Sequence, residues 1–319
     1  MPSTVRALLG LGAGLAADTL FGDPHRWHPV AGLGTFAARL EQVLWADRRA
    51  SGVLHVAAVV APAVLLSSRA ERMLSPGRRT LLLAAAGWAA VGGRSLRCAA
   101  LVLDDALRAG RLDDARALLP TLCGRDPAGL DEAGLRRAAV ESVAENTSDA
   151  VVGPLLWGAL LGVPGVVAYR TVNTLDAMVG HRSSRYRRFG WAAARLDDVA
   201  NLLPSRLTAL LVMAVAPLTG GDARGAWRVW RRDGSKHPSP NSGQCEAAFA
   251  GALGVRLGGR NVYGSRVEDR PVLGDGPAPG PGTVNRAARL SAAVSWAALP
   301  ASVLLGGALR AALSRAVRR

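Results

Sequence analysis

Three carboxylates at regular spacing open the most polar stretch of the chain, the segment ESVAENTSD at residues 141–149. Glu141, Glu145 and Asp149 stand four residues apart, and a continuous α-helix would line them along one face. Carboxylates stacked in this way repel one another, so we expect a divalent cation or arginine partners beside them. One or two carboxylates together with phosphate oxygens suit Mg²⁺. The alternative is structural, with a helix ending here and a residue of the Asn-Thr-Ser run capping the next helix.

A second polar set follows the broken apolar stretch at residues 150–169. Its members are carboxylates, amides and bases, namely Asn173, Asp176, His181, Asp197, Asp198, Asn201 and Arg206. Ionisable groups beside a segment apolar enough to enter a bilayer are costly unless they act on something. Broken helices at membrane depth are tolerated where they are buried in protein or line a cavity. The combination predicts a site at a membrane face.

A third polar group lies in the stretch RDGSKHPSPNSGQCEAAFAGALG at residues 232–254. Glycines and prolines hold a loop that displays Lys236, His237, Ser239, Asn241 and Ser242 before a helix starts near Gln244-Cys245-Glu246. Backbone N–H groups at a helix start, with a lysine in the loop, bind phosphate well. The stretch is not a Walker A sequence, which requires G-x-x-x-x-G-K-[ST]. It therefore predicts a phosphate site of another kind.

The fourth polar group is the tight turn GDPHRWHP at residues 22–29. It presents Asp23, His25, Arg26 and His28 on one loop. Because a third nearby histidine or cysteine is missing from the sequence, hydrogen bonding or phosphate contact is favoured over metal ligation.

The elements that position these groups are predicted to be helices. Half the residues are hydrophobic and only 5% are aromatic, so small aliphatic side chains carry the apolar surface, as in closely packed helices. The alternating β-branched and aromatic pattern of strands is missing. We expect an all-α chain, a single membrane-embedded helical domain over residues 1–319, with a flexible Pro/Gly-rich loop at residues 274–283. Its apolar segments are 4–21, 53–68, 80–93, 150–169, 207–219 and 287–309.

The placement of the polar groups suggests a topology. If all six apolar segments crossed the membrane, residues 170–206 would lie opposite the other polar motifs. Treating 150–169 and 207–219 as re-entrant or in-plane elements leaves four spans and puts every polar motif on one side. That side carries most of the basic residues, which makes it cytoplasmic by the positive-inside rule. The basic C-terminal tail falls on the opposite side and argues against this arrangement.

Composition excludes several other classes. The formal net charge is +15, but arginines are scattered through the loops rather than massed on one helix, which favours cytosolic loops and anionic substrates over nucleic acid. Cys98, Cys123 and Cys245 lack C-x-x-C spacing, so neither a disulfide framework nor a zinc site is indicated. Residues 5–21 lack a cleavage pattern and read as a retained span, not a signal peptide.

Four long motifs in order resemble the adenosylcobinamide-phosphate synthase family, the CobD/CbiB membrane proteins of cobalamin biosynthesis. They are DTLFGDPHRWHPV at 18–30, ESVAENTSDAVVGPLLW at 141–157, NTLDAMVGHRSSRYRRFGWAAARLDDVANLLPSR at 173–206 and DGSKHPSPNSGQCEAAFAGALGV at 233–255, followed by Asn261 and Tyr263. The resemblance covers nearly the whole chain. It implies an inner-membrane enzyme that joins adenosylcobyric acid to (R)-1-amino-2-propanol O-phosphate, or a related aminoalcohol phosphate, through an amide bond. ATP as co-substrate and Mg²⁺ are implied as well.

The resemblance also implies roles for single side chains. Mg²⁺ would sit among Glu141, Glu145, Asp149, Asp176, Asp197 and Asp198. Lys236 and Arg206 would neutralise phosphate oxygens, and His237 or His181 would take a proton from the attacking ammonium. Contacts with the substrates are expected from Asp23, His25, Arg26, His28, Asn146, Asn173, Ser239, Asn241, Ser242, Asn261 and Tyr263.

Two other functions remain open. Polar residues beside broken helices also form the substrate sites of carriers, so a membrane transporter of a corrinoid or another anionic substrate is the main alternative. The other is a scaffold for the late enzymes of the same pathway. In each case the lipid bilayer is a partner and nucleic acid is not.

Overall fold

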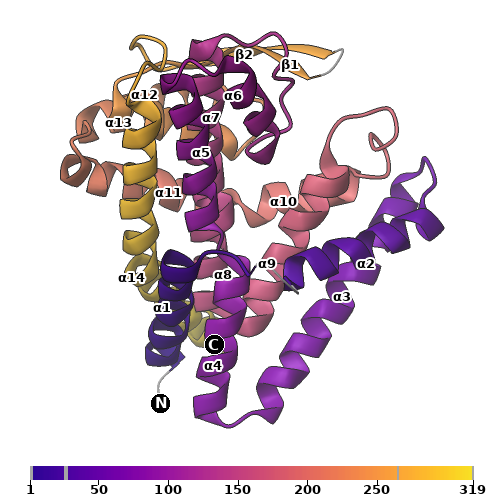
Figure 1. Cartoon of the computed structure of the whole chain (residues 1–319). Helices are drawn as coiled ribbons and strands as arrows, with labels where there is room; N and C mark the ends of the chain where they lie inside the picture. The colour runs from indigo at the N-terminus through magenta and orange to yellow at the C-terminus, as the bar shows by residue number, and fades with distance from the viewer. Residues whose placement is uncertain (1–2, 25–27, 264–265, 318–319) are drawn as a thin grey trace. The chain divides into compact units, whose positions relative to one another are not determined.

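The computed structural model describes residues 3–24, 28–263 and 266–317 (Figure 1). Packing divides the chain into two compact units, each discontinuous in sequence. Unit 1 comprises Met1–Gly92, Asp149–Asn201 and Leu299–Arg319, and unit 2 comprises Gly93–Ser148 and Leu202–Ala298. The division concerns packing alone, so a single domain stays a prediction. Helices dominate both units, and the prediction of an all-α fold is confirmed.

Unit 1 is a set of helices joined by short turns. They are α1 (Ser3–Phe21), α2 (Pro29–Leu44), α3 (Arg49–Met73), α4 (Pro76–Ala90), the π-helical segment η2 (Ser148–Val152), α8 (Gly153–Leu161), α9 (Val163–Leu175), the π-helical segment η3 (Asp176–Gly180) and α10 (Trp191–Ala200). The first residue of η2, Ser148, is assigned to unit 2 and the rest of η2 to unit 1. α1 lies against α4 (Figure 1), and a Cβ on Gly14 would stand 2.8 Å from the carbonyl oxygen of Ala84. Glycine at this position therefore lets the two backbones approach closely.

The core of unit 1 is built where α2, α3, α9 and α10 meet. It contains Ala37, Val56, Val59, Leu175, Val179, Phe189 and Ala193. Phe189 belongs to the segment that leads into α10, and its ring lies 5.1 Å from that of His55 on α3. Burial of these apolar side chains holds the segment 181–190 against α3.

Unit 2 surrounds one short central helix. Its elements are α5 (Gly93–Arg108), α6 (Leu112–Leu118), η1 (Leu119–Thr121), α7 (Glu132–Thr147), α11 (Leu202–Val215), η4 (Ala216–Thr219), α12 (Ala223–Asp233), α13 (Ser242–Leu253), β1 (Leu257–Tyr263), β2 (Arg266–Leu273) and the first part of α14 (Thr283–Val317). α13 is buried along its whole length and packs against α7, α11 and α12. A Cβ on Gly251 would collide with the carbonyl oxygen of Gly225, so glycines on α13 and α12 permit this close crossing.

The antiparallel hairpin β1–β2 is an exception to the helices that the sequence predicts throughout the chain. Gly258 and Gly259 both have positive φ, and the pairing is irregular between Leu257 and Gly259. Such glycines, together with Pro271 on the second strand, conceal the alternating pattern by which strands are recognised. Beyond the hairpin, backbone N–H groups of Gly274 and Arg256 tie down the start of the segment predicted to be flexible.

Among the described residues, four helical segments are long and apolar enough to cross a membrane, as predicted for a polytopic membrane protein. They are Thr4–Phe21, Arg49–Met73, Leu202–Thr219 and Thr283–Ala316. One of them differs from the prediction, because Leu202–Thr219 takes the place of residues 80–93. Most of 80–93 lies in α4, whose 15 residues are too few. The segment 207–219 gains five residues because its helix starts at Leu202 and tolerates Pro204 in its first turn.

The predicted break within residues 150–169 is confirmed. α8 has 9 residues and ends at Gly162, whose φ of 72° is left-handed, and α9 begins directly after it. Neither helix reaches the ~20 residues of a perpendicular span. The re-entrant assignment of this stretch stays a prediction.

Candidate functional site

A buried carboxyl lies at the centre of unit 2. Glu246 is in the second turn of α13 and is 1% exposed, and among the described residues neither of its carboxyl oxygens has a hydrogen-bond partner. Burial first, and then the negative charges of Glu141 and Glu145, hold the pKa of Glu246 well above its usual range. These surroundings favour the protonated form of Glu246, and a cation brought beside it would favour the loss of that proton.

Glu141 has the arginine partner that the sequence offered as one alternative. Its carboxylate pairs with Arg125, whose guanidinium is equally buried, and accepts the backbone N–H of Gly258 at 2.7 Å. Arg137 stands 3.9 Å away on the same helix. Glu141 is thus neutralised by the protein itself.

Glu145 is tied to the polar loop that precedes α13. The hydroxyl of Ser242 donates to its Oε1 at 2.5 Å. Ser239 Oγ accepts the backbone N–H groups of Asn241 (3.3 Å) and Ser242 (3.2 Å). These contacts fix the loop at the N-terminal end of α13, beside the acids of α7.

Asn241 and Arg206 anchor the other side of the same loop. Asn241 Oδ1 accepts from Ser205 Oγ at 3.1 Å and from Arg206 Nη1 at 3.0 Å. Arg206 also donates to the carbonyl oxygen of Pro240 at 3.2 Å. The guanidinium therefore shapes the loop in this structure, and its predicted hold on phosphate requires these contacts to be shared or exchanged.

His237 is set up as a hydrogen-bond donor. Its Nδ1 accepts the backbone N–H of Ser239 at 3.0 Å, while the buried Nε2 has no partner in the part of the chain that the structure describes. Burial and the positive charge of Arg270 lower the pKa of His237. A neutral imidazole with Nδ1 occupied carries its proton on Nε2. In this geometry it can donate to an oxyanion, whereas the predicted role as a base requires the contact with Ser239 to break.

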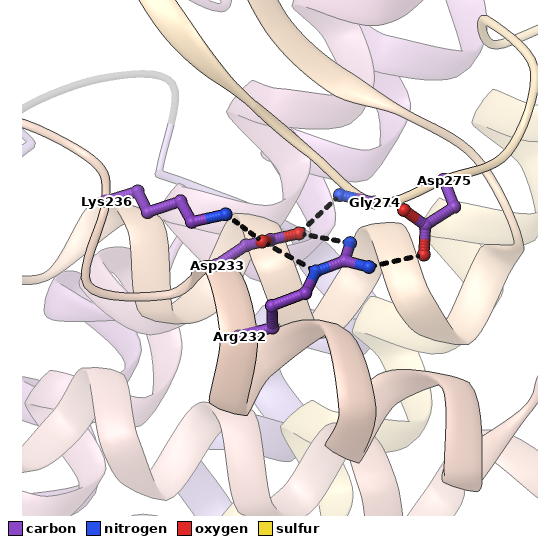
Figure 2. A network of polar contacts seen from close by, with 5 residues as sticks. All are labelled: Arg232, Asp233, Lys236, Gly274 and Asp275. Carbon is purple, nitrogen blue, oxygen red and sulfur yellow. Dashed lines mark hydrogen bonds and ion pairs between the residues drawn. The ribbon is translucent and has the colours of Figure 1, made fainter.

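A saturated ion-pair network lies at the start of the same loop (Figure 2). Asp233 is 1% exposed and accepts from Arg232 (2.7 Å), Lys236 (2.8 Å) and the N–H of Gly274 (3.0 Å), while Arg232 also pairs with Asp275 at 2.8 Å. The guanidinium of Arg232 above all holds the pKa of Asp233 far below its usual range. Lys236, predicted to neutralise phosphate, is thus paired, although about half of its side chain (49%) is exposed.

In unit 1 the polar residues of the 173–206 motif form an amide–carboxylate chain. Asp197 accepts from Asn173 Nδ2 at 3.3 Å and from Asn201 Nδ2 at 3.0 Å. Tyr169 donates to Asn201 Oδ1 at 2.7 Å. Asp198 pairs with Arg195 at 3.4 Å. Asn173, Asp197 and Asn201 of the motif are therefore in contact in this structure.

The predicted single helical face of Glu141, Glu145 and Asp149 is wrong. α7 ends at Thr147, and Asp149 lies in the π-helical segment Ser148–Val152. A π-helical turn holds more residues than an α-helical one, so Asp149 does not continue the row formed by Glu141 and Glu145. Asp176 opens the second π-helical segment, and its carboxylate lies so close to Gly180 that a Cβ there would collide with it.

The other predicted residues have separate local contacts. His28 caps α2, with its Nδ1 accepting the N–H of Val30 at 3.2 Å. His181 is exposed, edge-on to Tyr186 at 4.9 Å. Asp23 is half-buried, and Asn146 donates to the carbonyl oxygen of Ser142 at 3.0 Å. His25 and Arg26 lie outside the described residues, and for Asn261 and Tyr263 only the backbone positions on β1 are described.

The six carboxylates predicted to hold Mg²⁺ are divided between the units, with Glu141 and Glu145 in unit 2 and the other four in unit 1. Among the residues that the structure describes, no group of three or more His, Cys, Asp and Glu side chains could hold a metal ion. A preformed protein cage does not fit. A Mg²⁺ that arrives with phosphate oxygens would need only one or two carboxylates from the protein, and Glu145 would be the one in unit 2 to supply such a contact.

Sequence reasoning missed Glu246. The residue was taken only as part of a helix start, although it is the single charged group in the run QCEAAFAGALG. A lone carboxylate in a segment of small and apolar residues is a signal of a buried ionisable group, which is rare unless it is paired or functional.

These elements define a helical, polytopic membrane protein with a buried acid and imidazole beside one polar loop. The chain belongs to the CobD/Cbib protein family, whose pattern matches residues 11–291. It is 52% identical to the cobalamin biosynthesis protein CobD of Mycobacterium tuberculosis over 299 residues, which is 93% of this chain and 95% of that protein. The proteins of the same name from Geobacter metallireducens (47% identity, 81% and 83% covered) and Chromobacterium violaceum (42%, 96% and 100%) are also similar. No solved structure matches the chain.

Proposed function

We propose that this protein acts in cobalamin biosynthesis as an ATP-dependent ligase. It joins the carboxylate of adenosylcobyric acid to the amine of (R)-1-amino-2-propanol O-phosphate, or a related aminoalcohol phosphate. Family membership and the names of the relatives support the pathway. The observation that carries the chemistry is the buried, unpartnered carboxyl of Glu246 beside Glu145, because the reaction needs a group that receives a cation and then a proton.

The reaction balances in two steps. The substrate carboxylate attacks the γ-phosphorus of ATP, which forms an acyl phosphate and releases ADP. The amine then attacks the acyl carbon, the C–N bond forms, the C–O bond to phosphate breaks, and inorganic phosphate leaves. One proton of the substrate ammonium must be lost for the amine to attack, so the site needs a base.

We assign that base to Glu246. A carboxyl whose pKa is raised is matched to accept a proton from an ammonium near neutral pH. Binding of the ammonium beside Glu145 and Glu246 favours ionised Glu246, which returns to its neutral resting form when it takes the proton. His237 donates from Nε2 to a phosphate or acyl oxygen, and Lys236 and Arg206 attract phosphate groups. Mg²⁺, held by Glu145 and the nucleotide's oxygens, would offset the charge of the transferred phosphoryl group.

The test is turnover by the full chain purified in a neutral detergent. Adenosylcobyric acid, aminopropanol phosphate and Mg·ATP should give adenosylcobinamide phosphate, ADP and phosphate in equal amounts, and omission of ATP should abolish the product. A panel of aminoalcohol phosphates identifies the amine. Uptake of corrinoid into proteoliposomes without product in this assay would support the transporter instead.

A further inference from the structure

A basic cleft in unit 1 lies apart from every residue assigned above. Its volume is about 530 Å³, and it is lined by Asp47, Arg48, Arg49, Arg187 and Arg188. Two of the arginines stand at the start of α3 and two in the segment that leads into α10. The cleft therefore joins two stretches of chain that are far apart in sequence.

A close backbone contact holds these two stretches together. A Cβ on Gly52, in the first turn of α3, would collide with the carbonyl oxygen of Phe189. Only glycine permits this approach. Phe189 is fully buried in the core of unit 1, so the arginines that precede it are fixed beside those of α3. Core packing therefore fixes the two backbone stretches that carry the arginines of the cleft.

The charge of the cleft is poorly compensated from within. Arg188 stands 3.7 Å from Asp47, and Arg49 lies over the ring of Trp191 at 5.1 Å. Within the described part of the chain, no ion pair joins Arg48 or Arg187 to a carboxylate. Four guanidinium groups against one carboxylate leave a net charge of three. Such a concentration of positive charge favours an anion in the cleft.

The geometry of the groups indicates the kind of anion. Guanidinium is planar and donates two parallel hydrogen bonds, which suits the oxygens of phosphate. Arg49 is also the first residue of a helix long and apolar enough to span the membrane, so the cleft stands at the end of that apolar segment. Trp45 and Trp191 are both exposed beside it, as is typical of residues at a membrane interface.

We propose that this cleft binds a phosphate-bearing anion, and that the source of the phosphate is the headgroup of an anionic phospholipid. Basic pockets beside membrane helices bind such headgroups. The site goes beyond the proposed ligase reaction and uses none of its residues. It would fix the membrane-facing end of α3 and the segment 181–190 to the lipid surface.

The experiment measures the thermal midpoint of the full chain in a neutral detergent during titration with three probes: short-chain phosphatidylglycerol, short-chain phosphatidylcholine and inorganic phosphate. A ligand that binds only the native state raises the midpoint with the logarithm of one plus the ratio of its concentration to its Kd. Phosphatidylglycerol should raise it along this curve, and phosphatidylcholine should not. The R48Q/R187Q variant should lose about tenfold or more in affinity for phosphatidylglycerol, since two charge-assisted contacts are removed.

The matched control is R69Q/R78Q, which removes two exposed arginines near the opposite end of α3 and should bind as the wild type does. If R48Q/R187Q fails to fold, R48K/R187K replaces it, because this variant keeps both positive charges. It should bind phosphatidylglycerol more weakly than wild type, since lysine lacks the planar guanidinium that donates two parallel hydrogen bonds. Unchanged affinity in the cleft variants, or equal losses in the control, would overturn the site. Equal binding of inorganic phosphate would overturn the lipid as its source.

Discussion

Two buried carboxyls in the same polar loop region have opposite surroundings. Asp233 accepts from Arg232, Lys236 and Gly274 (Figure 2), whereas Glu246 accepts no hydrogen bond from the residues that the structure describes. Both are 1% exposed. The pKa of Asp233 is lowered by its partners, and that of Glu246 is raised by burial and by neighbouring carboxylates.

The difference separates a structural group from a reactive one. A buried carboxylate with all its partners in place stabilises the loop and has no lone pair to spare. A buried carboxyl with none costs stability, since its desolvation is not offset by any hydrogen bond. A role in the reaction would explain why such a group is present at the centre of a packed unit. The variants below test whether Asp233 is needed for stability and Glu246 for catalysis.

The largest effect is expected for Glu246→Gln. The amide cannot take a proton from the substrate ammonium, so kcat should fall by about 10²–10⁴-fold. The thermal midpoint should stay the same or rise, because a neutral amide resembles the neutral acid present at rest. Turnover and thermal unfolding of the same preparation give both values. A variant with normal kcat would remove Glu246 from the reaction.

The pH dependence of unfolding adds a second measurement on Glu246. Its folded pKa lies above the unfolded value of ~4.3, so the folded state keeps a proton that the unfolded state loses. Its contribution is fully present below pH ~4.3 and is lost as the pH rises through the folded pKa. E246Q should remove this loss at high pH, and wild type and variant curves of equal slope would contradict the assigned protonation.

Asp233→Asn should destabilise the protein by about 2 kcal/mol, because the charge-assisted hydrogen bonds of a buried carboxylate are lost while Arg232 and Lys236 remain partly solvated. Urea unfolding measures the difference. The folded pKa of Asp233 is lowered, so its contribution is present above the unfolded value of ~3.9 and is lost as the pH falls through the folded pKa. The variant should therefore lose less stability than wild type in that acidic range.

His237 offers a comparison of two replacements. Glutamine can place an N–H near the position of Nε2, and asparagine can place an oxygen near Nδ1, where it keeps the N–H of Ser239. If Nε2 donates to an oxyanion, H237Q should retain about tenfold more activity than H237N, since one donor to a developing charge is worth 10²–10³ in kcat. If both variants lose the same activity, and the pH profile of kcat no longer falls on its acidic side, His237 would instead be the base.

The smallest effect is expected for Lys236→Met. The ion pair with Asp233 is half-exposed, so its loss should change the free energy of unfolding by under ~1 kcal/mol. If Lys236 leaves Asp233 to hold phosphate, the KM for the phosphate-bearing substrate should rise while kcat changes little. Arg232→Met, which breaks two ion pairs without reaching the loop's tip, is the matched control for stability.

Much of the fold could be predicted because the helices carry long apolar segments and the motifs are contiguous in sequence. The pairing of Arg125 with Glu141 could not, because the arginine lies in a turn with no periodic relation to α7. Glu246 was overlooked since an acid near a helix start is usually solvated. Residues 207–219 are long enough to span the membrane only if their helix also includes the polar residues Ser205 and Arg206. It does include them, because both side chains are hydrogen-bonded to Asn241 in the loop before α13.

The two π-helical segments, Ser148–Val152 and Asp176–Gly180, have a consequence for how this chain tolerates changes in length. Each accommodates more backbone per turn than an α-helix. Deleting one residue from a regular α-helix rotates everything after it by ~100° about the helix axis. Deleting one from Ser148–Val152 would instead let the wide turn relax to the ordinary repeat, so the side chains of α8 would keep their directions. This segment is therefore the place in the helix from α7 to α8 where the loss of one residue disturbs the packing least.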